Sequence, residues 1–153
     1  MRRTRLVASS AVPAAVRSPE LTAVVPHDPR YAILFEPVKI GPKTTPNRFY
    51  TSPYSPSWGM HQIDQQTAHR AMRAEGGWGV VNTGEVTFGD DSGQHVDILW
   101  LRDERDAKVL SKLVDAVHGH GSLAGAELSH HGAWAMPHRT RSHAYAPSQV
   151  ISD

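Results

Sequence analysis

Two stretches decide the fold: residues 79–86, GVVNTGEV, and residues 122–128, SLAGAEL. Both are short apolar runs that are typical of buried strands. Each follows a stretch that predicts a helix, the first over residues 65–74 and the second from Asp103 or Asp106 onwards. Because neighbouring parallel strands need a crossover helix between them, this alternation predicts an α/β protein with a parallel sheet.

The flanking sequence predicts the remaining elements. The stretch of residues 31–49 alternates apolar and polar residues at Phe35, Val38 and Ile40 and breaks at Gly41 and Pro42, which favours a short β-hairpin or cap. Residues 49–52 form a third strand candidate. We expect Asp64 to cap the first helix and Gly76 to end it. Its predicted apolar face consists of Ala68, Ala71 and Met72. The second helix carries apolar residues at i, i+3, i+4 and i+7, which are Leu110, Leu113, Val114 and Val117.

Composition excludes several classes of function. The 153 residues carry a formal net charge of +1, which gives no electrostatic footprint for nucleic acid. Cysteine is absent, so these residues hold no disulfide, thiolate metal site or cysteine nucleophile. No run reaches the ~20 apolar residues that a membrane span requires. We therefore expect a cytoplasmic protein that contacts neither nucleic acid nor membrane.

The first 27 residues have a different texture. They open with basic residues and a weakly apolar stretch that Pro13 and Arg17 interrupt. This arrangement resembles a targeting signal only faintly, and we expect a disordered leader over residues 1–27.

Glycine positions decide which nucleotide motifs are excluded. The glycines at 76–79 and 119–121 lie between a helix end and the next strand, whereas a phosphate-binding fingerprint follows a strand and opens a helix. We interpret both groups as helix stops. An open doubly wound sheet and a closed (β/α) barrel both remain compatible with the alternation, and no Gly-x-Ser-x-Gly elbow supports serine hydrolysis.

Ten histidines invite a metal hypothesis, but none belongs to a His-Glu-x-x-His pair. His118 and His120 fall at a helix end, where an imidazolium complements the helix dipole. His130 and His131 follow the third strand, on the side where barrel enzymes place their active sites. We predict no metal site and keep His130 and His131 as candidates for lining a substrate site.

Four motifs occur in an order that resembles a known family. They are Asn47-Arg48, Glu75-Gly76-Gly77, Gly119-His120-Gly121 and Ala146-Pro147-Ser148. The segment from about His27 to Asp153 resembles the opening of the old yellow enzyme (NADH:flavin oxidoreductase) family, and is most similar to its trimethylamine and dimethylamine dehydrogenase branch.

The resemblance implies a (β/α)8 TIM barrel with FMN at the carboxyl ends of its strands. Because such barrels take roughly 250 residues, residues 28–153 are expected to form a truncated FMN-binding barrel: an N-terminal hairpin and about three βα units. Later catalytic residues, and any iron–sulfur cluster, would then lie beyond Asp153. We expect the chain by itself to be inactive; its oligomeric state stays open.

The resemblance also places residues at the cofactor. Ser52, Pro53, Tyr54 and Ser55 match the segment that approaches the flavin, although a proline-bounded turn would look the same. Ser55 stands where the amine dehydrogenases carry the cysteine that bonds to the flavin. Because a hydroxyl cannot form that thioether, we expect non-covalent FMN.

Two carboxylates are further candidates. Glu127 matches a glutamine that bonds the pyrimidine edge of the flavin in many family members, and a carboxylate can still accept from the ring N–H. Glu85 matches a position beside the ring and is the candidate catalytic residue as well as a cofactor contact. Surface exposure is the alternative interpretation of both. For Glu127 we favour the flavin role, because it follows the apolar run of residues 122–126 and burying an unpaired carboxylate is costly. The arginine that is common after His-x-Gly is replaced by Ala133.

The leading hypothesis is that the complete protein oxidises an N-methylated amine or amino acid, a small-molecule amine substrate, through FMN. One alternative is an NAD(P)H-dependent ene-reductase of the same family, whose substrate-binding histidines lie on later strands. Another is a truncated gene product without function.

Overall fold

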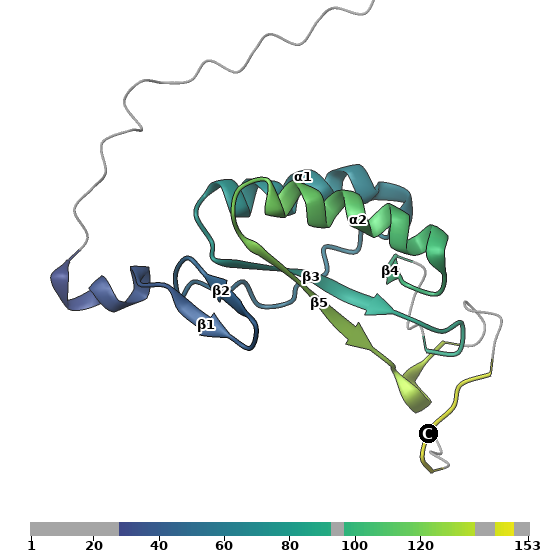
Figure 1. Ribbon diagram of the computed structural model, residues 1–153. Coiled ribbons are helices and arrows are strands. Elements are labelled where there is room, and N and C mark those ends of the chain that lie inside the picture. Colours follow the sequence, from purple (N-terminus) through teal and green to yellow (C-terminus); the bar gives the residue numbers. More distant parts are fainter. Residues whose placement is uncertain (1–27, 93–96, 137–142, 149–153) are drawn as a thin grey trace, which may run out of the picture.

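The computed structural model describes residues 28–92, 97–136 and 143–148. The leader predicted over residues 1–27 lies outside these ranges. A small hairpin unit is followed by a parallel sheet whose strands alternate with two helices (Figure 1). The predicted α/β alternation is therefore observed.

The hairpin unit begins with the 3₁₀ helix η2 (Pro29–Phe35), which Asp28 caps by accepting a hydrogen bond from the Arg30 amide. Strands β1 (Val38–Ile40) and β2 (Lys43–Thr45) then pair antiparallel. The predicted hairpin is thus confirmed. Thr45 is almost completely buried, which ties this unit to the sheet.

The sheet has β3 (Val80–Thr87) at its centre, between β4 (Leu99–Trp100) and β5 (Leu123–Ser129), and both pairings are parallel. The strand predicted over residues 49–52 is reduced to one parallel bridge between Tyr50 and Val80. Two backbone bonds hold it: the Val80 amide donates to the Phe49 carbonyl at 3.1 Å, and the Thr51 amide donates to the Val80 carbonyl at 3.0 Å.

Helices α1 (Ile63–Glu75) and α2 (Glu104–His118) lie side by side on one face of the sheet (Figure 1). The Asp103 carboxylate accepts bonds from the amides of Arg105 and Asp106, so the second predicted helix begins after Asp103. The buried core between helices and sheet consists of Ala74, Val81, Leu113 and Val117.

Helix α1 differs from its prediction in two ways. Gln62, and not Asp64, occupies the cap position, with no side-chain cap bond, and Asp64 lies in the first turn. The buried stripe is Gln66, Arg70 and Ala74, whereas Ala68 is exposed and Met72 is 60% exposed. Hydrophobicity mispredicted this face because Arg70 turns inward to bond a loop carbonyl, which carries polar positions into the interior. The predicted stop at Gly76 is confirmed.

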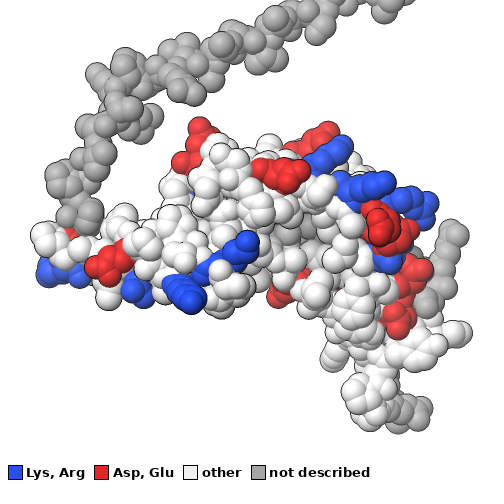
Figure 2. All heavy atoms as spheres, in the orientation of Figure 1, with Lys and Arg blue, Asp and Glu red and all other residues white. Residues whose placement is uncertain are grey.

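Basic and acidic side chains are interspersed on the face that Figure 2 shows, with no broad field of one sign. Among the described residues, no helix has the length and apolar character needed to cross a membrane.

Candidate functional site at the carboxyl ends of β3 and β5

The carboxyl ends of β3 and β5 lie at the same edge of the sheet because the two strands are parallel (Figure 1). Glu85 is near the end of β3, and Glu127 lies opposite it in the register of β5. The chain after β5 returns to this edge, where the His131 amide donates to the Ser92 carbonyl at 3.1 Å. The short 3₁₀ helix η4 (Gly132–Trp134) follows.

An irregularity in β3 decides which way Glu85 faces. Val81 pairs with Ala124 and Glu85 pairs with Glu127, so four steps along β3 match three along β5, and β3 holds one extra residue between Asn82 and Glu85. Such a bulge re-aims the side chains that follow it. Ala124 packs on the core beneath the helices. Because side chains alternate along a strand, Glu127 and its neighbour Glu85 face away from the helices.

Glu85 makes a short contact with the Nε2 atom of His131. The side chains of Glu85 and His131 are 14% and 21% exposed, so the pair is largely shielded from water yet reachable. Thr87 adds a hydrogen bond at 3.4 Å from its hydroxyl to the same Glu85 oxygen. The pair is an ion pair when the imidazole is protonated and a hydrogen bond when the imidazole is neutral.

His130 has different partners from those of His131. Its Nδ1 accepts from the Gly132 amide at 2.9 Å, and its Nε2 lies 3.6 Å from Asp91. The ring also packs against Phe88, with centroids 6.0 Å apart. Of the two histidines proposed from the sequence, the structure brings only His131 to Glu85.

Glu127 is exposed, and no hydrogen bond or ion pair joins it to another described residue. An exposed carboxylate on the face opposite the helices is free to accept hydrogen bonds from a ligand. Its exposure removes the cost of burying an unpaired charge.

The loop of residues 52–55 lies directly on β3. A side chain on Gly84 would place its Cβ 2.5 Å from the Tyr54 carbonyl oxygen and 2.6 Å from the Ser55 Cα. Only glycine permits this approach. Ser52 and Tyr54 are exposed, while Pro53 and Ser55 are half-buried, so the loop presents one face to solvent and rests the other on the sheet.

Two residues that the sequence did not single out hold this loop. The Asn82 side-chain amide donates to the Thr51 carbonyl at 2.5 Å, and the Arg70 guanidinium donates to the Tyr54 carbonyl at 2.6 Å. The only sequence signals were Asn82, a polar residue within an otherwise apolar strand, and Arg70, a charged residue outside the predicted apolar face of its helix. Neither position matched a known motif.

Two basic residues, His69 and Arg73, lie next to Arg70. Burial, and secondarily the charge of Arg73, lower the pKa of Arg70 to about 10, so the guanidinium stays charged at neutral pH. Burial, followed by the charges of Arg70 and Arg73, also lowers the pKa of His69. His69 is therefore a neutral imidazole between two guanidinium groups, which contact its two ring nitrogens.

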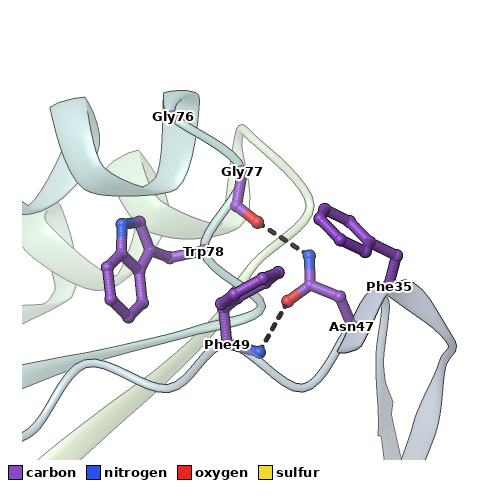
Figure 3. Close-up of a pocket in the computed structure, with 6 residues that line it drawn as sticks. All are labelled: Phe35, Asn47, Phe49, Gly76, Gly77 and Trp78. Atoms are coloured by element: carbon purple, nitrogen blue, oxygen red, sulfur yellow. Dashed lines mark hydrogen bonds between the residues drawn. The ribbon is translucent and has the colours of Figure 1, made fainter. Parts of the chain in front are cut away.

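A pocket of about 470 Å³ lies at the opposite, amino end of β3 (Figure 3). The Asn47 side chain bridges it, donating to the Gly77 carbonyl at 2.7 Å and accepting from the Phe49 amide at 3.0 Å. Phe35 and Trp78 flank Phe49 edge-on. With aromatic walls and internally satisfied polar groups, this pocket has the character of structural packing.

Metal binding has no support in the part of the chain that the structure describes, where no three candidate ligands cluster. His118 closes α2 and His120 follows it, and both are exposed at the helix end as predicted.

Comparisons with known proteins agree on one family. Residues 33–152 match the NADH:flavin oxidoreductase / NADH oxidase family. Dimethylamine dehydrogenase of Hyphomicrobium sp. (strain x) is 42% identical over 129 residues, which cover 82% of this chain and 17% of that protein.

Solved structures give the same result. A 6-hydroxypseudooxynicotine amine oxidase from Pseudomonas geniculata N1 superimposes with a TM-score of 0.76 at 43% identity, covering 79% of this chain and 18% of that one. Histamine dehydrogenase from Rhizobium sp. 4-9 gives 0.75 at 35% identity, covering 80% and 19%. The chain thus spans less than a fifth of the length of each of these three relatives, and its fold is the predicted portion of a (β/α)8 barrel.

Proposed function

Since the chain belongs to the NADH:flavin oxidoreductase / NADH oxidase family, we propose that it forms one part of the active site of an FMN-dependent amine-oxidising enzyme. The substrate class is a secondary or N-methylated amine or amino acid. The names of its relatives, a dimethylamine dehydrogenase, an amine oxidase and a histamine dehydrogenase, support an amine substrate.

The residues at the carboxyl edge suit a non-covalently held FMN. The 52–55 loop offers backbone groups next to β3, at Gly84, where no side chain projects from the strand. Glu127 offers an exposed carboxylate that can accept a hydrogen bond from a ring N–H. Ser55 has a hydroxyl where a thioether would need a thiol, and its Oγ already accepts weakly from the Ser57 amide at 3.4 Å. When bound, FMN supplies the two-electron acceptor for amine oxidation.

The observation that carries the proposal is the shielded Glu85 carboxylate, which the bulge turns toward the face opposite the helices. A substituted ammonium is the ligand that such a carboxylate prefers, because a charge-assisted hydrogen bond is roughly twice as strong as a neutral one. His131 keeps Glu85 oriented until the substrate nitrogen arrives.

Glu85 has a second available role, as acceptor of the proton that leaves the amine during oxidation. The contact with His131 gives that proton a further place to go. Binding and proton transfer affect kinetics differently, so one substitution distinguishes them.

The test replaces Glu85 by Gln in the complete barrel protein and measures steady-state oxidation of dimethylamine and N-methylated amino acids. If Glu85 pairs with the cation, KM rises by about tenfold or more. If it accepts the proton, kcat falls by about a hundredfold or more. The exposed Glu75→Gln is the matched control. Unchanged kcat and KM for every amine would remove Glu85 from the site, and flavin reduction by NADH or NADPH alone would favour the ene-reductase alternative.

Flavin attachment has its own test. Acid precipitation of the complete protein should release the yellow colour into the supernatant, because Ser55 cannot form the thioether. Colour that remains in the pellet, with no cysteine elsewhere to explain it, would contradict non-covalent binding.

A further inference from the structure

We propose that Arg70 is a positioning residue for the flavin: its guanidinium fixes the backbone of the 52–55 loop and thereby sets the affinity for FMN. The inference rests on the proposed function, which places FMN against this loop. It assigns a role to a buried side chain on α1 that faces the loop from the helix layer.

The loop depends on outside donors for its shape. Pro53 and Pro56 have no backbone N–H, and no backbone–backbone hydrogen bond joins two residues of segment 52–56. Its carbonyls are held instead at Thr51, by Asn82 on β3, and at Tyr54, by Arg70 on α1. The two bonds lie on either side of Pro53 and define where the loop runs.

Using Arg70 to bond the Tyr54 carbonyl requires burying a charged side chain, which costs free energy. The side chain is 1% exposed, and within the described residues it forms no ion pair with a carboxylate. Its Nε is buried without a hydrogen-bond partner. A buried charge of this kind is costly unless its bonds are good.

The remaining contact of Arg70 is shared. Arg73 approaches one nitrogen of His69 at 3.0 Å while Arg70 approaches the other. A neutral imidazole has only one acceptor nitrogen, so it can satisfy only one of the two guanidinium groups. The Tyr54 carbonyl is therefore the one acceptor on which Arg70 can depend.

The loop is confined from the opposite side by β3. Because Gly84 leaves no room for a Cβ beneath the Tyr54 carbonyl and Ser55, the backbone rests on the strand itself. Arg70 supplies the attraction and Gly84 the contact surface. Lysine cannot replace Arg70, because a single ammonium lacks the planar fork that reaches Tyr54 and His69 together.

The test measures FMN binding to the deflavinated complete protein by quenching of flavin fluorescence, together with thermal unfolding of the apoprotein. Arg70→Met should raise the Kd for FMN by about tenfold or more, since a hydrogen bond from a charged donor is lost. Arg70→Lys should also be impaired and should shift the absorption spectrum of the bound flavin. The matched control is Arg73→Met, one turn away: it removes a cation that also contacts His69 but has no bond to the loop.

The results distinguish a role of Arg70 in FMN binding from a role in folding alone. A wild-type Kd and flavin spectrum in folded Arg70→Met would overturn the proposal, even if the apoprotein melts earlier, because Arg70 would then serve the fold alone. So would an equal rise in Kd for Arg73→Met. If Met does not fold, Arg70→Lys decides, and failure of both to fold overturns the positioning role. A wild-type protein that binds no FMN would instead defeat the proposed function.

Discussion

The two ends of β3 differ in what surrounds them. At the amino end, near Val80, aromatic rings pack edge to face, with centroids 5.1 Å apart for Phe35 and Phe49 and 6.1 Å apart for Phe49 and Trp78. At the carboxyl end, a carboxylate and an imidazole meet at Glu85 and His131. The same strand thus links an apolar, internally satisfied region to a polar one that still has unused hydrogen-bonding capacity.

This difference indicates that the carboxyl end of β3 serves ligand binding and the amino end serves stability. In (β/α)8 barrels the loops after the strands carry chemistry, whereas the opposite face contributes to stability. Substitutions at the amino end should therefore change unfolding without changing catalysis, and those at the carboxyl end should change FMN or substrate binding as well. Four predictions test this in the complete barrel protein.

The largest effect is expected from Gly84→Ala at the carboxyl end. The new methyl would overlap loop backbone, which cannot move cheaply, so the free energy of unfolding should fall by about 3 kcal/mol. Because the displaced loop is the proposed FMN contact, affinity for FMN should fall too. Chemical denaturation measures the unfolding free energy, and FMN titration measures the affinity. Unchanged FMN affinity would show that the loop is not part of the flavin site.

Gly79→Ala is the corresponding change at the amino end. Its Cβ would lie 2.5 Å from the Asn47 Oδ1 and 2.8 Å from the Asn47 carbonyl oxygen. We expect a loss of about 2 kcal/mol in unfolding free energy, because part of this contact is a side chain that can shift. The same titration should show wild-type FMN affinity. A weakened affinity would mean that the two ends of β3 are coupled.

Asn47→Ala should have a smaller effect at the same end. It removes the bonds to the Gly77 carbonyl and the Phe49 amide, which costs about 1–2 kcal/mol. Thermal unfolding measures the loss, with kcat and KM for amines expected to match the wild type. Asn47→Asp offers a second comparison, because it keeps the acceptor for Phe49 but replaces the donor with a carboxylate oxygen that repels the Gly77 carbonyl oxygen.

The smallest predicted effect is a pH dependence from His69. Its pKa is lowered in the folded protein by burial and by the neighbouring arginines, so the unfolded chain binds more protons below the usual value of 6.5. Stability should therefore fall as the pH drops below about 6.5. His69→Gln should flatten this part of the stability profile. A profile that is identical with and without His69 would contradict a neutral imidazole in the native state.

Elements with a local signature were predictable from the sequence. The apolar runs at 79–86 and 122–128 became β3 and β5, and of the two predicted starts for α2, Asp103 and Asp106, the structure uses Asp103. These features depend on neighbours in sequence. Because Glu85 and His131 both follow parallel strands in the sequence, they were expected at the same edge of the sheet. Their contact forms because the chain after β5 returns to this edge, where the His131 amide bonds the Ser92 carbonyl.

Features that depend on distant contacts were not predictable. The inward face of α1 was mispredicted because a loop carbonyl 16 residues away selects Arg70. The strand expected over residues 49–52 is shortened to a bridge, since only its contact with Val80 forms a ladder. The extra residue in β3 has no signature in the sequence. A bulge is a mismatch between the registers of two paired strands, so it exists only once β3 has paired with β5.

That extra residue makes the pairing of the strands, and not composition, the determinant of which face Glu85 occupies. If β3 continued as a regular ladder with all its residues, the four steps from Val81 would turn Glu85 toward the helices and Val86 toward the ligand face; the bulge reverses both. Backbone pairing thus changes what the site presents to a ligand without changing any amino acid. A relative that lacks one residue between Asn82 and Glu85 would be expected to have a regular ladder here and to keep the residue opposite Glu127 on the ligand face.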